Sequence, residues 1–257
     1  MPAAGPVAHR PRWRGPGLAL GLLAALLPAL AAAQPAPDRP RLPGIGAADP
    51  RRPVELDQPP WRAFGRVQQD LGKRCSGALV GPRLVLTAAH CLVAPRSGNL
   101  VQPETLHFLL GYDRGRFAGH GRVTGFQVAP GYRPDGKGPR GADWALLTLD
   151  APLGTPDLVL PLLDAPPPPR TPLMLGGYQQ DRPERLLADT GCRAIGTAQG
   201  GTLLLHDCAG THGASGAPVL ARGPDGRWAV AGVTSGQLAE VAMGVAVAVQ
   251  GFAAALR

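Results

Sequence analysis

The chain has 257 residues, a formal net charge of +8 and 44% hydrophobic residues, which is enough apolar material for a core larger than that of a typical single domain. Arginine carries almost all of the positive charge, and no run of arginines is interleaved with aromatic residues, so we expect scattered surface charge and no nucleic-acid partner. The 36 glycines and 30 prolines approach the fraction seen in disordered chains, but many of them punctuate short apolar runs, as turns do in all-β proteins.

The first 33 residues have the order of a secretory signal. Arginines within residues 10–14 precede an apolar stretch over residues 18–30, and Ala31-Ala32-Ala33 offers a small-residue cleavage site. The apolar stretch is short and rich in Pro and Ala for a membrane span, although a retained N-terminal anchor is the alternative. We therefore predict a signal peptide over residues 1–33 and a secreted or periplasmic protein that makes no membrane contact once the leader is removed.

A Pro-rich arm or pro-segment is predicted for residues 34–60, which lack an apolar period. The folded part is expected to begin at residues 61–68, where large apolar and polar residues alternate. Short apolar runs separated by turn residues then predict the strands of a first β-barrel within residues 61–157. These runs end or lie at residues 79–80, 84–87, 106–110, 122–128 and 144–149.

A proline-rich stretch over residues 164–172 is predicted to connect two halves, because proline cannot donate to a strand ladder. The second half, residues 158–257, is predicted to form a second β-barrel with a short C-terminal helix at residues 252–256. Its expected strands lie at residues 173–178, 193–196, 203–207, 218–221, 228–233 and 241–249. From the residues alone, this pattern predicts a barrel or a sandwich.

Four cysteines follow the predicted leader, and an even number in an exported chain predicts disulfides. We favour the pairs Cys75–Cys91 and Cys192–Cys208, since each pair brackets a predicted hairpin. The rival is a zinc site, which the sequence supports poorly because no CxxC spacing is present.

Three short motifs carry the residue types of nucleophilic catalysis. His90 lies in Thr-Ala-Ala-His-Cys at 87–91, Asp143 directly precedes an apolar strand, and Ser215 lies in Gly-Ala-Ser-Gly-Ala-Pro at 213–218. A serine hydroxyl needs an adjacent base, and that base needs a third group to fix its tautomer. Asp135 and Asp150 compete for the third role, but neither precedes a strand directly. An α/β-hydrolase would need the reverse order and Gly-x-Ser-x-Gly, so this class is nearly excluded.

Together these motifs resemble the chymotrypsin/trypsin-like serine peptidases, over about residues 61–250. The bacterial secreted branch, which includes the glutamyl endopeptidases, looks nearest. The resemblance implies two antiparallel six-stranded β-barrels with the active site in the cleft between them. It also implies that Ser215 is the nucleophile, His90 the base and Asp143 its orienting partner, with the N–H groups of Gly213 and Ser215 as the oxyanion hole. A disulfide beside the histidine fits the same family.

The sequence departs from trypsin itself in two places. Ala214 stands where trypsin-type enzymes carry the aspartate that receives the freed N-terminus, and no Ile-Val-Gly-Gly start is present. Any maturation would therefore follow another route. The resemblance also implies the substrate-binding positions, which are Ala209, Thr234, Ser235 and Gln237. Ala209 at the pocket base lacks the acid that selects Arg or Lys, so we expect a small or uncharged substrate residue.

The remaining histidines receive other interpretations. His212 is expected to line the cleft, whereas His107, His120 and His206 are expected to be surface or packing residues. We predict a secreted, monomeric serine endopeptidase that hydrolyses protein or peptide substrates and needs no metal or organic cofactor. The alternative is a non-catalytic binding or scaffold protein on the same fold, since fold alone does not determine function.

Overall fold

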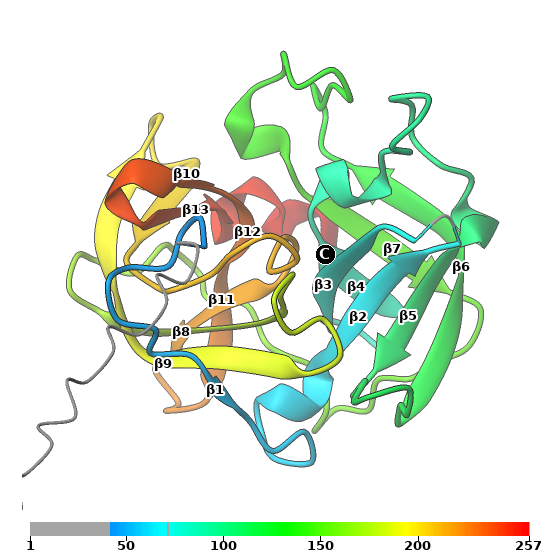
Figure 1. Cartoon of the computed structure of the whole chain (residues 1–257), viewed down its shortest axis with the longest axis horizontal. Coiled ribbons are helices and arrows are strands. Elements are labelled where there is room, and N and C mark those ends of the chain that lie inside the picture. Colours follow the sequence, from blue (N-terminus) through cyan, green and yellow to red (C-terminus); the bar gives the residue numbers. More distant parts are fainter. Residues whose placement is uncertain (1–41, 71, 257) are drawn as a thin grey trace, which may run out of the picture. The chain divides into compact units, whose positions relative to one another are not determined.

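The protein is all-β in the computed structural model, which describes residues 42–70 and 72–256. The predicted leader, residues 1–33, and the first part of the arm lie outside the described residues. The strands form two closed six-stranded antiparallel barrels, as predicted (Figure 1). The distinction between a barrel and a sandwich, which the residues alone leave open, is therefore decided in favour of barrels.

The first barrel contains six strands in the order β2-β3-β4-β7-β6-β5, and β2 pairs with β5 to close it. Its strands are β2 (Phe64–Gln69), β3 (Arg74–Leu79), β4 (Leu84–Thr87), β5 (Leu106–Leu110), β6 (Gly119–Val128) and β7 (Ala145–Leu149). β5 alternates buried and half-buried residues, with Leu106, Phe108 and Leu110 facing the core. This period of two is what a strand on a barrel wall requires.

The second barrel closes through the pairing of β8 with β9 and carries β1 as an extra strand beside β9. Its strands are β8 (Pro172–Tyr178), β9 (Leu186–Ala198), β10 (Leu203–His206), β11 (Pro218–Arg222), β12 (Trp228–Leu238) and β13 (Met243–Ala248), with β1 at Arg52–Pro53. β9 begins well before the predicted strand at residues 193–196. The first half of β9 contains polar residues and a glycine, so the sequence does not distinguish it from a loop.

β7 explains how the two cores are joined. Leu147 and Leu149 pack in the core of the first barrel, while Leu146 packs in the larger core that contains the second barrel. A strand that is buried on both faces reads as a continuous apolar run. This accounts for the apolar run over residues 144–147, which ends before the exposed Thr148.

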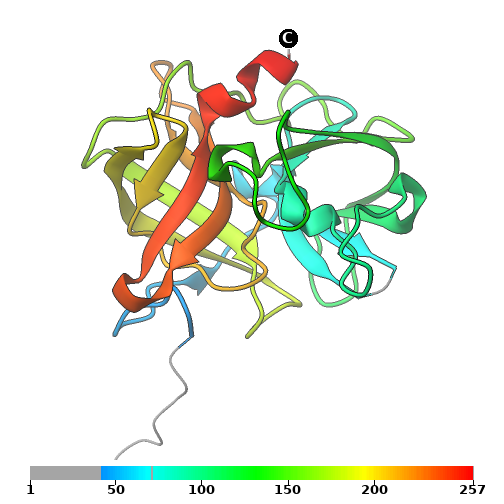
Figure 2. The ribbon, with the colours of Figure 1, turned by 90° about the horizontal axis from the view of Figure 1, so that it is seen from above.

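The described part of the arm packs against the second barrel. β1 pairs with Ala188 and Leu187 of β9, and the Arg51 side chain just before it is fully buried. At the other end of the chain, 3₁₀ turns η6 (Val249–Gly251) and η7 (Ala253–Leu256) follow β13, as Figure 2 shows. A short helix was predicted at this position.

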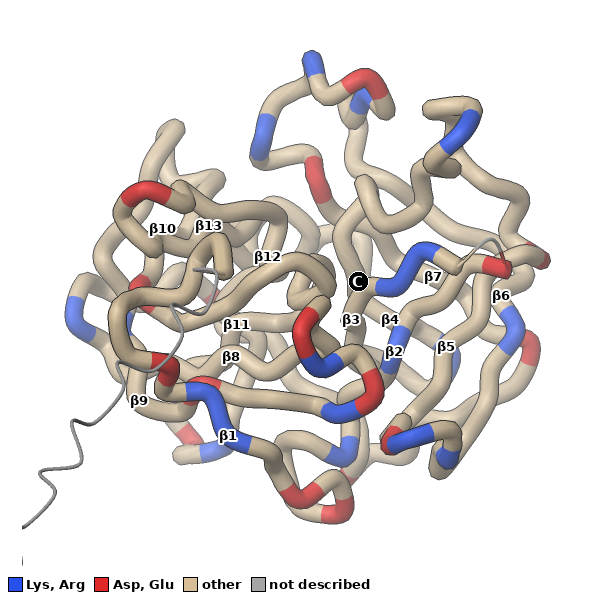
Figure 3. The backbone as a smooth tube through the Cα atoms, in the orientation of Figure 1, with Lys and Arg blue, Asp and Glu red and all other residues tan. Residues whose placement is uncertain are grey.

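Both barrels carry one disulfide each. Cys75 is bonded to Cys91 and Cys192 to Cys208, which are the pairs favoured by the sequence, and no free cysteine is found among the described residues. Lysine and arginine residues are spread over both barrels (Figure 3). None of the described helices has the length and apolar character needed to cross a bilayer.

Candidate active site

The three predicted catalytic residues lie in turns and loops next to strand ends, and these connections surround one pocket. His90 lies in the 3₁₀ turn η2 (Ala89–Leu92) after β4, and Asp143 follows the turn η4 (Arg140–Ala142) and precedes β7. Ser215 lies in the loop between β10 and β11 of the second barrel. All three line a pocket of about 480 Å³. The structure therefore gathers residues from both barrels at one site.

Asp143 holds His90 through two hydrogen bonds. Its Oδ1 accepts the backbone N–H of His90 at 2.8 Å, and its Oδ2 lies 2.7 Å from Nδ1 of the imidazole. Because a carboxylate can only accept, the single proton of the neutral imidazole lies on Nδ1, and Nε2 is then left with a lone pair. This is the tautomer that a general base requires.

Ser235 of β12 supplies a third hydrogen bond to the same carboxylate. Its Oγ donates to Oδ2 of Asp143 at 2.5 Å. Burial raises the pKa of the Asp143 carboxyl, but the hydrogen bonds from His90 and Ser235 and the charge of His90 outweigh burial, so the pKa lies below its ordinary value. Asp143 is therefore ionised at neutral pH.

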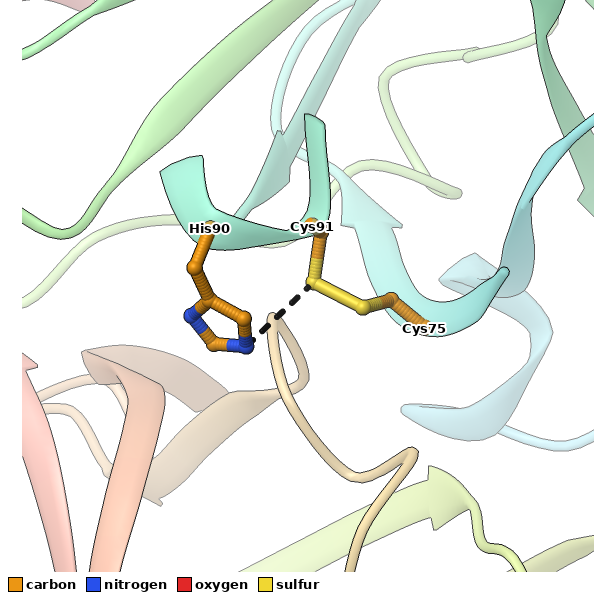
Figure 4. Close-up of side chains that lie close together, drawn as sticks. All are labelled: Cys75, His90 and Cys91. Atoms are coloured by element: carbon orange, nitrogen blue, oxygen red, sulfur yellow. Dashed lines mark hydrogen bonds between the residues drawn. A yellow bond between two sulfur atoms is a disulfide. The ribbon is translucent and has the colours of Figure 1, made fainter. Parts of the chain in front are cut away.

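Ser215 and His90 lie in the same pocket without a direct hydrogen bond in this structure. Nε2 of His90 is 3.9 Å from Sγ of Cys91, which is bonded to Cys75 (Figure 4). The disulfide sulfur has no proton and Nε2 of the neutral ring has the lone pair, so neither atom can donate a hydrogen bond in this contact. Catalytic hydrogen bonds are commonly loose in proteins without substrate and tighten when substrate binds.

The loop that carries Ser215 is fixed by Ser76 of the first barrel. The backbone N–H of Ser76 donates to the carbonyl oxygen of Ser215 at 2.9 Å, and Ser76 Oγ donates to the carbonyl oxygen of Gly213 at 2.8 Å. The N–H groups of Gly213 and Ser215 donate to no acceptor within the described residues. Two unpaired N–H groups beside a serine side chain are free to bind a ligand oxygen, as an oxyanion hole would require.

Glycine is required at position 213. Its φ is +93°, and a Cβ there would lie 2.2 Å from the carbonyl oxygen of Tyr178. Any other residue would meet both the unfavourable backbone region and this clash. Glycine at position 213 therefore permits the backbone conformation that this loop adopts.

The far end of the pocket is formed by β10, β12 and β13. Thr234 and His206 are buried there, and Gln237 lies at the wall. Burial of the His206 ring lowers its pKa to about 4, although the charge of Asp207 acts in the opposite direction. Gly44 of the arm also lines the pocket, and its carbonyl oxygen accepts the N–H of Gly210 at 3.3 Å.

Arg51 of the arm connects to the same loop through a side chain of the second barrel. Its guanidinium donates to both carboxylate oxygens of Asp181 and to Oε1 of Gln179 at 2.7 Å. The same Oε1 accepts the backbone N–H of Thr211 at 2.8 Å. A buried cation thus helps to order the segment just before Ser215, where Ala214 replaces the aspartate of trypsin-type enzymes.

Two clusters of potential metal ligands occur among the described residues, and neither offers a free thiolate. One contains Cys75, His90 and Cys91, and the other contains Cys192, Asp207 and Cys208. The four sulfur atoms are all in disulfides. Because thiolates are the sulfur ligands of zinc, these clusters do not fit the zinc alternative.

The comparison with known families agrees with this geometry. The family model described as Trypsin matches residues 50–256. The chain belongs to the trypsin family. The resemblance to the chymotrypsin/trypsin-like serine peptidases is thereby confirmed. Assignment to the bacterial branch stays a prediction.

Individual relatives within or near the trypsin family are distant. The cercarial protease of Schistosoma mansoni is 28% identical over 177 residues, which are 63% of this chain and 62% of that protein. A solved structure of a Glu endopeptidase in complex with MPD has a TM-score of 0.69 at 18% identity, and covers 82% of this chain and 98% of its own. Human heparin binding protein has a TM-score of 0.62 at 19% identity, with 80% and 93% covered. These structures show the shared fold.

The predicted residues of the trypsin-family site fall into two groups. His90, Asp143, Ser215, Thr234, Ser235 and Gln237 line the pocket, as does His212. Ala209 and Gly213 lie in the loop that borders it, with Ala209 buried. Ser235 was predicted as a substrate-binding residue, and the structure gives it a direct bond to Asp143 as well.

Sequence reasoning missed four residues around the site. Ser76, Arg51 and Gly44 are remote from the motifs along the chain, so no local pattern announces them. His206, expected at the surface or in packing, is buried and lines the pocket. Its proximity to Cys208 was the available signal. His107 and His120 contact each other, and His107 also contacts Asp70, a carboxylate neighbour that the sequence did not suggest.

Proposed function

We propose that the protein is a serine endopeptidase in which Ser215 is the nucleophile, His90 the general base and Asp143 the residue that orients His90. The observation that carries this proposal is the Asp143–His90 hydrogen bond, which leaves Nε2 of the imidazole unprotonated in the pocket that contains Ser215. Membership of the trypsin family supports it.

The reaction would follow the acyl-enzyme route. Ser215 Oγ attacks the carbonyl carbon of the scissile peptide while its proton passes to Nε2 of His90. His90 then gives this proton to the departing amine, and the acyl group remains on Ser215. A water molecule, deprotonated by His90, hydrolyses the ester. Asp143 stays ionised throughout and stabilises the imidazolium.

The N–H groups of Gly213 and Ser215 would stabilise the oxyanion that forms in each half of the reaction. Ser76 holds the carbonyl oxygens of Gly213 and Ser215, and these bonds anchor the loop on which the two N–H groups lie before the charge develops. Loss of one such donor typically costs about 3 kcal/mol in the barrier. The route needs no metal or organic cofactor.

The protein would act on protein or peptide substrates outside the cytoplasm, as a monomer. Two disulfides support an oxidising compartment. The proposed leader over residues 1–33 would deliver the chain there.

A non-catalytic binding protein is the second candidate. It is favoured by the missing hydrogen bond between Ser215 and His90 and by Ala214 at the position of the activation aspartate. Human heparin binding protein, which is named for binding, shares the fold. On this view the pocket would hold a peptide without cleaving it.

Cleavage of a peptide library separates the two candidates. The chain is expressed in an exporting host, purified with its disulfides intact, and compared with Ser215→Ala and His90→Ala. We expect peptide products from the unchanged protein and a loss of at least about 10³-fold in either variant. Equal background rates from all three proteins would support the binding protein instead. Circular dichroism checks that each variant is folded.

A further inference from the structure

Two buried polar atoms in the pocket have no hydrogen-bond partner among the described residues. They are Nε2 of His206 and Oγ1 of Thr234. Both residues line the pocket that contains Ser215. A buried polar group without a partner is destabilising because it has lost its hydrogen bonds to water, and natural proteins keep few of them. Two such atoms in one pocket indicate that a bound ligand supplies their missing hydrogen bonds.

The strand register places both side chains on one face of the barrel wall. β13 lies between β10 and β12. His206 is opposite Gly244 of β13, and Thr234 is opposite Ala246. Residues two apart along a strand point to the same side of the sheet. The imidazole and the hydroxyl therefore approach the pocket from the same side, one on each flank of β13.

Gly244 makes room for the imidazole. A Cβ at this position would lie 2.0 Å from Cε1 and 2.6 Å from Nε2 of His206. The ring is therefore packed directly against the backbone of β13, where a side chain would otherwise stand. This close packing restricts the ring to one position relative to Thr234.

The hydrogen-bond character of the imidazole is determined by its other nitrogen. The backbone N–H of Cys208 donates to Nδ1 of His206 at 3.2 Å, so Nδ1 carries the lone pair. Burial lowers the pKa of the ring to about 4, and the ring is neutral at pH 7. The single proton then lies on Nε2, which is a donor. The Thr234 hydroxyl can both donate and accept.

We propose that His206 and Thr234 select a carboxamide side chain, that of Gln or Asn, on the residue that precedes the scissile bond. The carboxamide oxygen accepts the Nε2–H of His206, and the carboxamide NH₂ donates to Oγ1 of Thr234. This inference rests on the proposed function, and it sharpens the expectation of an uncharged residue into a chemical class.

Other side chains match these two atoms less well. The heads of Lys and Arg only donate, so they would place a donor against Nε2–H. An aliphatic side chain leaves both atoms unpaired. A carboxylate would face a neutral imidazole, and the next residue in the chain, Asp207, already acts on this ring with its negative charge. A second negative charge beside the ring is unfavourable, because like charges repel.

The test uses matched peptides that differ only at this residue, with Gln, Asn, Glu, Met, Leu or Arg. For the exported, disulfide-bonded protein we expect kcat/KM for Gln or Asn to exceed that for Met by about tenfold, the equivalent of about one well-placed hydrogen bond. Thr234→Val keeps the shape of the side chain and removes Oγ1, so the ratio of carboxamide to Met should fall several-fold. His206→Phe should abolish the preference, and His107→Phe, outside the pocket, should retain it.

Binding of the same peptides to Ser215→Ala, measured by calorimetry, separates this inference from the proposed function. Preferential binding of carboxamide peptides without cleavage by the unchanged protein would contradict the proposed function alone. The inference is overturned by equal rates and affinities for Gln, Asn and Met, by a preference for Glu, or by a carboxamide preference that survives in Thr234→Val and His206→Phe.

Discussion

Asp143 accepts hydrogen bonds from the backbone and imidazole of His90 and from the hydroxyl of Ser235. These bonds serve different purposes in the proposed mechanism. The two from His90 determine the tautomer and the orientation of the ring. The bond from Ser235 keeps the carboxylate ionised and limits its rotation, because a hydrogen bond to the charged form favours that form.

Replacement of Ser235 by Ala should therefore weaken the base without removing it. A hydrogen bond to a charged group contributes about 1.5–3 kcal/mol, so kcat/KM is expected to fall by about tenfold or more. The pKa of Asp143 should rise toward its ordinary value, so activity should decline at a higher pH as the solution is acidified. Rates measured down to about pH 3, below the ordinary aspartate pKa of about 3.9, test this. An unchanged acid limb would show that Ser235 does not act through Asp143, and Thr148→Ala, an exposed site on β7, is the control.

His206 should make the fold sensitive to mild acid. Burial lowers its pKa to about 4 in the folded state, whereas the unfolded chain takes up the proton near pH 6.5. As pH falls between these values, the unfolded state binds a proton that the folded state does not bind, so stability decreases. The loss approaches about 3 kcal/mol at pH 4.

Urea unfolding at pH 7.5 and pH 4.5 measures this loss. His206→Phe cannot titrate, so the fall in unfolding free energy between the two pH values should be smaller by about 2 kcal/mol. Equal falls in the two proteins would show that the imidazole is not held neutral. The comparison remains valid if the variant is less stable at both pH values, because it uses only the difference in unfolding free energy between them.

Among the secondary-structure elements, the Ser215 loop (residues 207–217, between β10 and β11) is held by residues from three other segments. Ser76 of β3 fixes Gly213 and Ser215, Gln179 after β8 fixes Thr211, and Arg51 before β1 fixes Gln179. Each segment is remote from the loop in the sequence. The arm therefore forms part of the support of the site.

Arg51→Met should destabilise the fold and slow catalysis together. The variant leaves Asp181 without its cation and Gln179 without one donor. Because Asp181 and Asp49 retain solvent access, we expect a moderate loss of about 2 kcal/mol. Arg52→Met is the matched control, since Arg52 is exposed and bonds only to backbone oxygens. Unfolding in urea and peptide cleavage should distinguish the variants, and equal behaviour would remove Arg51 from the support of the loop.

The features that were predictable from sequence are the local ones. The alternation of buried and half-buried residues in β5 and the apolar run of β7 mark both segments as strands, and the motifs around His90, Asp143 and Ser215 indicate the candidate site. By contrast, the bonds of Ser76 and Arg51 join residues more than 100 positions apart, and only the closed barrels bring them together. His206 looked like packing because its role depends on register with Gly244 across β13.

At the scale of the whole molecule, two barrels with separate cores contribute to one pocket. The first barrel holds His90 and Asp143, and the second holds Ser215 and the pocket floor. The Cys192–Cys208 disulfide links β9 covalently to the start of the Ser215 loop. It also adjoins the Cys208 N–H that holds His206.

Loss of this disulfide should reduce both the stability of the fold and the selectivity of the pocket. Closing a loop of this length contributes about 3 kcal/mol in the chain-entropy model. A Cys192→Ala and Cys208→Ala double variant should lose about this amount and should also lose selectivity among peptides, because the backbone at position 208 holds the His206 ring. Thermal unfolding and the peptide set above provide the two readouts. Selectivity that persists despite the stability loss would separate the disulfide from the pocket.

The proposed mechanism depends above all on the activation of Ser215 by His90. The decisive measurement is labelling of the purified, disulfide-bonded protein with a fluorophosphonate, followed by mass spectrometry to locate the adduct. We predict one adduct on Ser215, formed at least about 10³-fold faster than in His90→Ala. A folded protein that acquires no adduct, or acquires it equally fast without His90, would contradict the proposed mechanism.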